Sequence, residues 1–409
     1  MKKLLLLVLC AALLLGACAN ASAAAYDGKL VKQTITPLDD SFVSGMADFG
    51  FSAAASLYSE DENLALSPVS LELALCLARA GATGATKDEM SAALRLPGLS
   101  DDEIAAACKA LMWRANTGGM EAANALWLLD GYDYNDNYIK TGTTDYMADL
   151  KPLALPGAMD DINAWAKDKT HGRISKMLQQ EPSSDTRLII TNALYYLGEW
   201  QRPFLAANTT SLDFAAPDGA VSVPFMRSEW TVPYYSSDTF SMISLRLKSQ
   251  EGEGRYAMAF LLPAEGTSVA QLLASMNGAA FQTALQSAAE QEVWIRLPKF
   301  EFEYLAPMSD TLKGMGMKKA FSSADADFSG ITSEEPLFIA NVLHKCYVRI
   351  DELGAEAAAV TEVEATAAAD EAPEQPTTFY ADRPFLFAIY SLEDGAIAFL
   401  GAINNPSQK

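Results

Sequence analysis

Histidine is scarce in this chain, and the common sequence motifs of hydrolases are absent as well. Only His171 and His344 occur among 409 residues, and HExxH, GxSxG, Ser-x-x-Lys and the P-loop are all missing. The stretches "EGEG" (251–254) and "GMGM" (314–317) do not fit the dinucleotide-binding pattern GxGxxG. A catalytic triad with distant partners could still use either histidine, so an exported hydrolase is kept as an alternative. No cofactor and no metal ion is expected.

Basic residues are also few, with 30 Lys and Arg against 52 Asp and Glu and a net charge of -22. A chain this acidic is repelled by nucleic acid and by anionic lipid, so neither is an expected partner. The cysteines form no CxxC pair, which argues against a structural zinc site. Cys76, Cys108 and Cys346 each lie in an apolar stretch, and we expect them to be buried free thiols.

The N-terminal residues have the pattern of an export signal. Lys2 and Lys3 precede an apolar run at 4–15, which is too short to span a bilayer. "LGAC" (15–18) resembles the lipobox of bacterial lipoproteins, in which the cysteine, here Cys18, carries lipid and becomes the new N-terminus. Ordinary cleavage near 23–25 is the alternative. We expect a bacterial protein exported to the cell envelope or surface through its lipid, or secreted if the lipobox is not used.

Predicted helices crowd the first half of the chain and predicted strands the second. This order is typical of an α+β protein rather than of alternating βαβ units. We expect a signal at 1–17, a tether at 18–40 and one domain at 41–409. Apolar spacing predicts helices at 40–58, 67–81, 101–115, 160–178 and 269–285, and strands at 120–131, 187–200 and through most of the C-terminal half.

An acidic, alanine-rich stretch, "DELGAEAAAVTEVEATAAADEAPEQP" (351–376), separates two apolar runs near the C-terminus. From Ala355 to Ala367 every second residue is small or apolar, and the intervening positions hold every charge. Period-two segregation predicts a strand with one face suited to burial. On a helix the glutamates would not share a face, although alanine and glutamate favour helices. A disordered acidic linker is the other interpretation.

Six sequence blocks, in order along the chain, resemble one family. They are "NLALSPVSLELALCLARAGATGATKDEM" (63–90), "IITNALYYLGEWQRPF" (189–204), "LPKFEFEY" with "LKGMGMKKAFSSADADFSGI" (297–331), "HKCYVRIDELGAEAAAVT" (344–361), "ADRPFLFAIY" (381–390) and "GAIAFLGAINNP" (395–406). On these blocks the chain resembles the serpins, a family of serine protease inhibitors. The resemblance implies three β-sheets, A to C, eight or nine helices, and an exposed reactive loop at about 352–378.

The resemblance also implies roles for five buried positions. Ser67, Ser70, Asn192 and His344 fall where the family has a hydrogen-bonded cluster beneath sheet A. Trp200 falls at the top of that sheet, where the loop first enters. Ordinary core packing is the alternative for each of them.

The same resemblance implies that the chain is an inhibitor and not an enzyme. A target serine protease would attack the loop and form a covalent complex, and the cut loop would insert into sheet A. Cysteine proteases are a second class of target, and a monomer is expected. The alternative within the family is a non-inhibitory surface binding protein.

The family pattern places the hinge and the scissile bond by counting. The hinge positions are Glu352, Gly354, Ala355, Glu356, Ala357, Ala358 and Ala359. Counting Glu352 as the first of 17 loop residues places the scissile bond between Ala368 and Ala369. Alanine there suits an elastase- or subtilisin-like protease, whereas cleavage after Asp370 or Glu371 would suit an acid-specific one.

Overall fold

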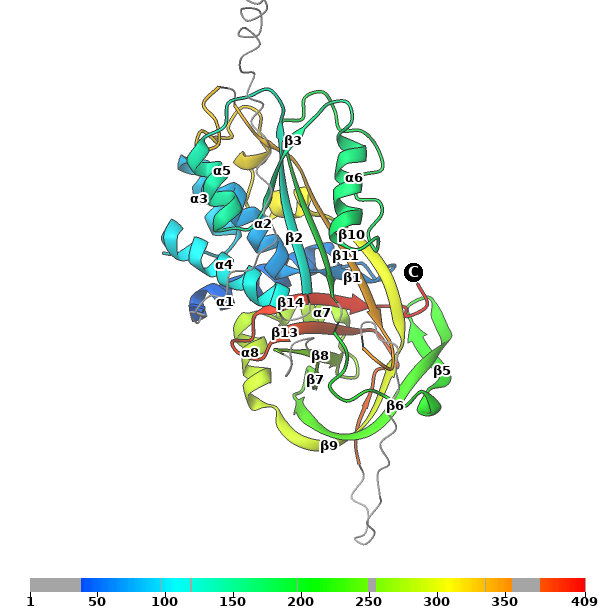
Figure 1. Cartoon of the computed structure of the whole chain (residues 1–409). Helices are drawn as coiled ribbons and strands as arrows, with labels where there is room; N and C mark the ends of the chain where they lie inside the picture. The colour runs from blue at the N-terminus through cyan, green and yellow to red at the C-terminus, as the bar shows by residue number, and fades with distance from the viewer. Residues whose placement is uncertain are drawn as a thin grey trace, which may run out of the picture.

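The computed structural model describes residues 38–96, 98–117, 120–196, 198–248, 255–334, 336–354 and 376–408. The expectations for the export signal, for Cys18 and for loop positions 355–375 therefore lie outside the described residues. Within them, a five-stranded sheet and most of the helices form one half of the molecule, and a nine-stranded sheet forms the other (Figure 1).

Nine α-helices lie in the described residues, which agrees with the eight or nine expected. The helices are α1 (Asp40–Leu57), α2 (Pro68–Ala80), α3 (Gly84–Ala93), α4 (Asp101–Thr117), α5 (Asp136–Thr144), α6 (Ala158–Lys169), α7 (Val269–Ser275), α8 (Gly278–Ser287) and α9 (Met308–Gly314). The strands are β1 (Leu64–Leu66), β2 (Met120–Leu129), β3 (Asp149–Leu153), β4 (Leu188–Tyr196), β5 (Thr210–Ala216), β6 (Gly219–Ser236), β7 (Phe240–Arg246), β8 (Tyr256–Pro263), β9 (Ala289–Pro298), β10 (Phe300–Pro307), β11 (Ile339–Ile350), β12 (Thr377–Tyr380), β13 (Phe385–Ser391) and β14 (Ile397–Ile403).

The five-stranded sheet has the order β10-β11-β4-β2-β3. At its centre β4 and β11 run parallel and pair directly from Leu188 opposite Ile339 to Tyr195 opposite Tyr347. We call this parallel ladder the seam. The strands on its two sides, β10 and β2, pair antiparallel with β11 and β4.

The nine-stranded sheet contains the long strand β6, which joins two groups of strands. Its first part pairs with β5 and β9, and its last three residues pair with β7. The first part of β6 forms one sheet with β5, β9 and β12, and its last part forms another with β7, β8, β13, β14 and β1. With the five-stranded sheet, this makes the three sheets that the family resemblance implies. Together with the nine helices, this arrangement confirms the α+β class and the predicted fold.

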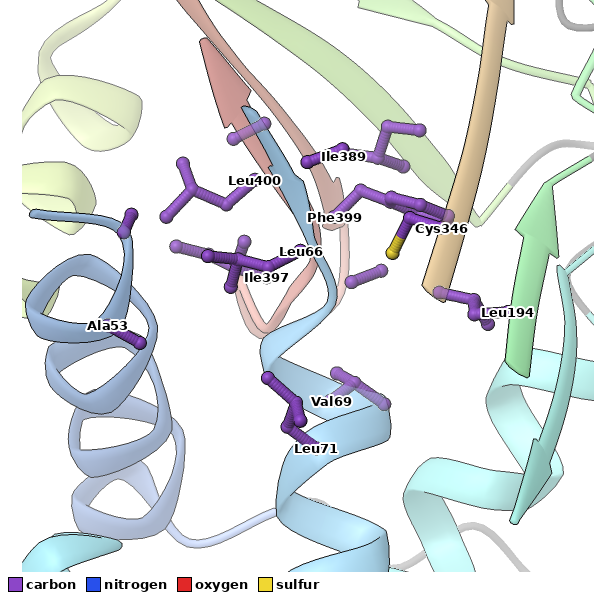
Figure 2. Close-up of a cluster of buried hydrophobic side chains, with 14 of the residues drawn as sticks. Ala53, Leu66, Val69, Leu71, Leu194, Cys346, Ile389, Ile397, Phe399 and Leu400 are labelled. Carbon is purple, nitrogen blue, oxygen red and sulfur yellow. The ribbon is translucent and has the colours of Figure 1, made fainter. Parts of the chain in front are cut away.

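Helix α2 lies between the two sheets, where it packs on β2, β4 and β14. Ser67 caps it by accepting a hydrogen bond from the Ser70 amide, and Pro68 fills the first helical position, as the sequence predicted. The adjoining core contains apolar side chains from both sheets: Leu194 and Cys346 lie in one cluster with Leu66 and Phe399 (Figure 2).

Helix α6 covers the other face of the five-stranded sheet (Figure 1). Its Trp165 packs edge-on against Trp127 of β2, with ring centroids 6.2 Å apart. The Trp165 indole N–H donates to Asp149 Oδ2 at 2.8 Å, so this helix is held by a polar contact as well as by apolar packing. No helix among the described residues is long and apolar enough to cross a membrane.

Two predicted helices were wrong in extent. The helix predicted over 160–178 ends at Lys169, because His171 and Gly172 have positive φ values of 47° and 83° that break the helix. The single helix predicted over 269–285 is two helices. The chain is extended at Met276, and the Asn277 side chain then accepts from the Ala280 amide to begin α8.

Candidate functional site

A buried polar cluster lies at the N-terminus of α2, beneath the seam. The Ser67 hydroxyl donates to the Ala398 carbonyl at 2.6 Å and accepts from the Ser70 amide at 3.1 Å. The Ser67 amide donates to His344 Nε2 at 2.9 Å. These bonds tie the start of α2 to β14 on one side and to β11 on the other.

His344 and Asn192 face each other in register across the seam. Because His344 Nε2 accepts a hydrogen bond from the Ser67 backbone amide, its other nitrogen Nδ1 carries the ring hydrogen and donates to Asn192 Oδ1 at 2.6 Å. Burial lowers the pKa of His344 to about 3, so the imidazole is neutral at pH 7. Protonation would remove the acceptor that the Ser67 amide uses.

Asn192 extends the cluster to a third strand. Its Nδ2 group donates to the Ser70 carbonyl at 3.0 Å, and also to the Ser70 hydroxyl and to Asn124 Oδ1 on β2. Sequence reasoning missed Asn124, although a lone amide in the apolar strand "EAANALWLL" is a usable signal. We use the name polar cluster for Ser67, Ser70, Asn124, Asn192 and His344.

The end of β11 forms a second site, the hinge turn at 351–354. Asp351 and Gly354 exchange both backbone hydrogen bonds, at 3.1 and 3.2 Å. Trp200 holds this turn from the chain that follows β4: its indole N–H donates to the Asp351 carbonyl at 2.8 Å and its backbone N–H to the Leu353 carbonyl at 2.9 Å. These bonds hold the hinge turn, which follows β11, against the chain that follows β4, at the end of the seam.

Glu352 fastens the hinge turn to the neighbouring strands. Its carboxylate accepts from Lys299 Nζ and from the Thr209 hydroxyl, each at 2.7 Å. Burial raises the pKa of Glu352, but the hydrogen bonds from Lys299 and Thr209 outweigh it and hold this pKa below its usual value. Neither Lys299 nor Thr209 is marked as a partner of Glu352 by a sequence motif.

Gly354 has a backbone conformation that other residues rarely adopt. Its φ is +120°, and a Cβ added there would lie 2.3 Å from the Gly198 carbonyl oxygen. Only glycine fits this close approach.

The structure thus brings the predicted residues together in two groups. Ser67, Ser70, Asn192 and His344 form one hydrogen-bonded set, and Trp200 bonds to Asp351 and Leu353 of the hinge turn that also contains Glu352 and Gly354. Cys76, Cys108 and Cys346 are buried and free, as predicted. The remaining predicted positions lie outside the described residues: Cys18, Ala355, Glu356, Ala357, Ala358, Ala359, Ala368 and Ala369.

The two histidines have different surroundings. His344 is fully buried beneath the five-stranded sheet, and His171 is an exposed residue in the turn after α6. In the part of the chain that the structure describes, no three His, Cys, Asp or Glu side chains gather closely enough to hold a metal ion.

Comparison with known proteins decides the family. The model of the family described as "Serpin (serine protease inhibitor)" matches residues 44–406. The chain belongs to the serpin family. A serpin-like protein of Thermococcus kodakarensis is 35% identical over 372 residues, which covers 89% of this chain and 85% of the relative.

Solved serpin structures agree with the fold. A thermophilic serpin, tengpin, in the native state matches with a TM-score of 0.83 and 28% identity, covering 91% of this serpin and 96% of tengpin. Human thyroxine-binding globulin in complex with its ligand matches with a TM-score of 0.77 and 23% identity, covering 89% of this serpin and 98% of the globulin, and shows the fold alone. Serpins are generally protease inhibitors rather than enzymes. In this serpin β4 and β11 pair directly with each other, above the polar cluster and beside the hinge turn.

Proposed function

We propose that this serpin is a suicide-substrate inhibitor of serine proteases, with an elastase- or subtilisin-like enzyme as its target. The observation that carries the proposal is the closed parallel seam with the hinge turn fastened across its top. The chain reverses direction at 351–354, directly after β11. A strand formed by the residues that follow would run antiparallel to both β11 and β4, and could pair with each of them if the seam opened.

The gain from such an insertion is worked from the seam. Eight paired positions would separate, and one parallel ladder would be replaced by two antiparallel ladders of similar length. The net gain is about eight backbone hydrogen bonds, or roughly 8 kcal/mol at about 1 kcal/mol each. This energy is comparable with the stability of a whole domain, which is about 5–15 kcal/mol, so it is enough to distort a protease carried with the strand.

The chemistry belongs to the protease. Its serine oxygen attacks the carbonyl carbon of Ala368, the bond to the Ala369 nitrogen breaks, and that nitrogen takes a proton and becomes the amino terminus of the C-terminal fragment. The acyl-enzyme ester holds the protease on the cut strand. Insertion then moves the ester away from the groups that would activate water, and hydrolysis stalls. The serpin is consumed in the reaction.

A gel assay with paired loop variants tests this function. Wild-type protein incubated with elastase or subtilisin is expected to give a covalent complex on a denaturing gel. Ala359→Arg places a charge on the face suited to burial, and this variant is expected to be cut as a substrate without a complex. Ala358→Arg, on the other face, is the matched control and should still trap the protease.

The opposite result would support a non-inhibitory role. If a broad panel of serine and cysteine proteases gave no covalent complex, and loop cleavage did not raise the melting temperature, the proposed mechanism would be refuted. The alternative would then be a monomeric surface binding protein built on the same fold.

We further propose that the protein is exported and attached to the cell envelope by lipid on Cys18. The support is the charged and apolar signal at 1–17 and the match of 15–18 to a lipobox. Cys18→Ser is expected to release the protein from the membrane fraction. Membrane association unchanged by this substitution would contradict the proposal.

A further inference from the structure

An exposed tryptophan lies beside the strand that follows the reactive loop. Among the described residues only four large hydrophobic side chains are strongly exposed, and Trp294, at 39%, is the one aromatic among them; the others are Leu205, Leu305 and Leu392. Trp294 lies on β9, in register with Thr378 of β12 on one side and with Glu229 of β6 on the other.

The reactive loop joins the sheet at this place. Thr378 lies nine positions after Ala369, a length of chain that spans roughly 30 Å at most. A compact protease of about 220 residues has a radius of gyration of about 17 Å. A protease bound at the Ala368–Ala369 bond therefore has surface within reach of Trp294.

The charges around Trp294 indicate what kind of surface would bind there. Glu229 faces Trp294 directly, and Glu292 shares its face of β9 because alternate residues of a strand point the same way. Both glutamates are exposed, and within the described ranges neither has an ion-pair partner. Arg296 is the next residue on this face in the other direction, and its guanidinium lies 3.8 Å from the centroid of the Tyr380 ring. The exposed Arg227 of β6 lies opposite Arg296, so the two basic residues of this face lie on the side of Trp294 away from Glu292.

We propose that Trp294, Glu229 and Glu292 form a secondary docking site for the protease that attacks the loop, and that this site binds a basic surface of that protease. This inference rests on the proposed inhibitory function. An indole with two adjacent carboxylates suits an Arg or Lys side chain, which can lie over the ring and pair with an acid. The net charge of -22 attracts a basic partner over a longer range.

The docking site affects the rate at which the protease binds the serpin, and it does not affect the later step in which the covalent complex is trapped. Trp294→Ala is expected to lower the second-order rate constant of inhibition about tenfold for a basic elastase-like protease. It should leave the stoichiometry of inhibition and the amount of final complex unchanged. Glu229→Lys is expected to lower the same rate constant and to weaken its dependence on salt.

The experiment uses a panel of basic and acidic elastase- and subtilisin-like proteases. Each one is tested as the active enzyme and as a variant with its active-site serine replaced by alanine. The active enzymes report the rate of inhibition, and the inactive ones report docking alone. Leu392→Ala is the matched control, because it removes a side chain of the same exposure, 38%, from the turn between β13 and β14.

The outcomes separate the two proposals. If covalent complexes form and Trp294→Ala inhibits as fast as Leu392→Ala, the docking site is refuted and the inhibitory function stands. If no protease is trapped but an inactive basic protease binds in a Trp294-dependent way, the inhibitory function is refuted and the docking site stands. If there is neither trapping nor Trp294-dependent binding, both are refuted.

Discussion

Replacing His344 by glutamine should remove a pH dependence that the buried imidazole imposes on the free energy of unfolding. In the folded protein burial lowers the pKa of His344 to about 3, against 6.5 for an unperturbed histidine. Below pH 6.5 the unfolded chain takes up a proton at this position and the folded protein does not. Stability is therefore lost as the pH falls, by about 1.4 kcal/mol for each pH unit below 6.5.

The expected difference is large enough to measure. Between pH 7.5 and pH 5 the imidazole should cost the wild-type protein about 2 kcal/mol. Glutamine can accept from the Ser67 amide and donate to Asn192, but it does not titrate. His344→Gln should be less stable than wild type at pH 7.5, because the amide fills the site imperfectly, and the gap should narrow by about 2 kcal/mol at pH 5.

Urea unfolding followed by circular dichroism at both pH values gives the comparison. His171→Asn is the matched control, because it removes the other histidine of the chain from an exposed turn, and asparagine tolerates the φ of 47° there. The carboxylates titrate alike in all three proteins and cancel. The reasoning is refuted if the difference in the free energy of unfolding between wild type and His344→Gln is the same at both pH values. It is also refuted if the difference between wild type and His171→Asn changes between the two pH values by the same amount as the difference for His344→Gln.

Three further predictions follow from buried groups and from the hinge turn. Burial raises the pKa of Glu72 to about 8, so the free energy of unfolding should fall as the pH rises from 4.5 to 8. Urea unfolding should show that Glu72→Gln removes about 3 kcal/mol of this loss between pH 5 and pH 8. Arg114 is buried and pairs with Asp394, so Arg114→Ala should cost about 3–5 kcal/mol in chemical unfolding, whereas a cost under 1 kcal/mol would mean that the pair is dispensable. Gly354→Ala should lower the melting temperature and speed proteolysis within the loop, because its Cβ would meet the Gly198 carbonyl; unchanged cleavage would show that the turn does not restrain the loop.

The parts of the site that could be predicted from the sequence are those with a local sequence pattern or a family motif. The Ser67-Pro68 start of α2 has a capping residue and a proline in the right order, and the cap formed as expected. Lys299 and Thr209 could not be predicted as partners of Glu352, because they meet it only once distant strands have packed. Asn124 lacked a motif of its own, and its role emerges from the register of β2 and β4.

The helix wrongly extended to 178 shows where periodicity misleads. Ile174 and Met177 have helical spacing and are buried, but they pack in the cluster under α6 as part of an irregular segment. The Thr170 hydroxyl donates to the Ala166 carbonyl and accepts from the Ile174 amide, which supports the chain after the helix ends. The apolar spacing correctly indicated that these side chains are buried. The positive φ values at His171 and Gly172, and not the spacing, determine where the helix ends.

The pairing of β1 with β14 has a consequence for how the protein is made. Leu64–Leu66 pair with Leu400–Ala402, and the Asn404 amide bonds to the Asn63 side chain 341 positions away. At a synthesis rate of about 5–20 residues per second, the first strand waits roughly 20 to 70 s for its partner. The carbonyl of Ala398 that receives the Ser67 hydroxyl arrives equally late. The nascent chain therefore completes this part of its core only after the residues of β14 have been synthesised, and loss of that strand should block folding as a whole.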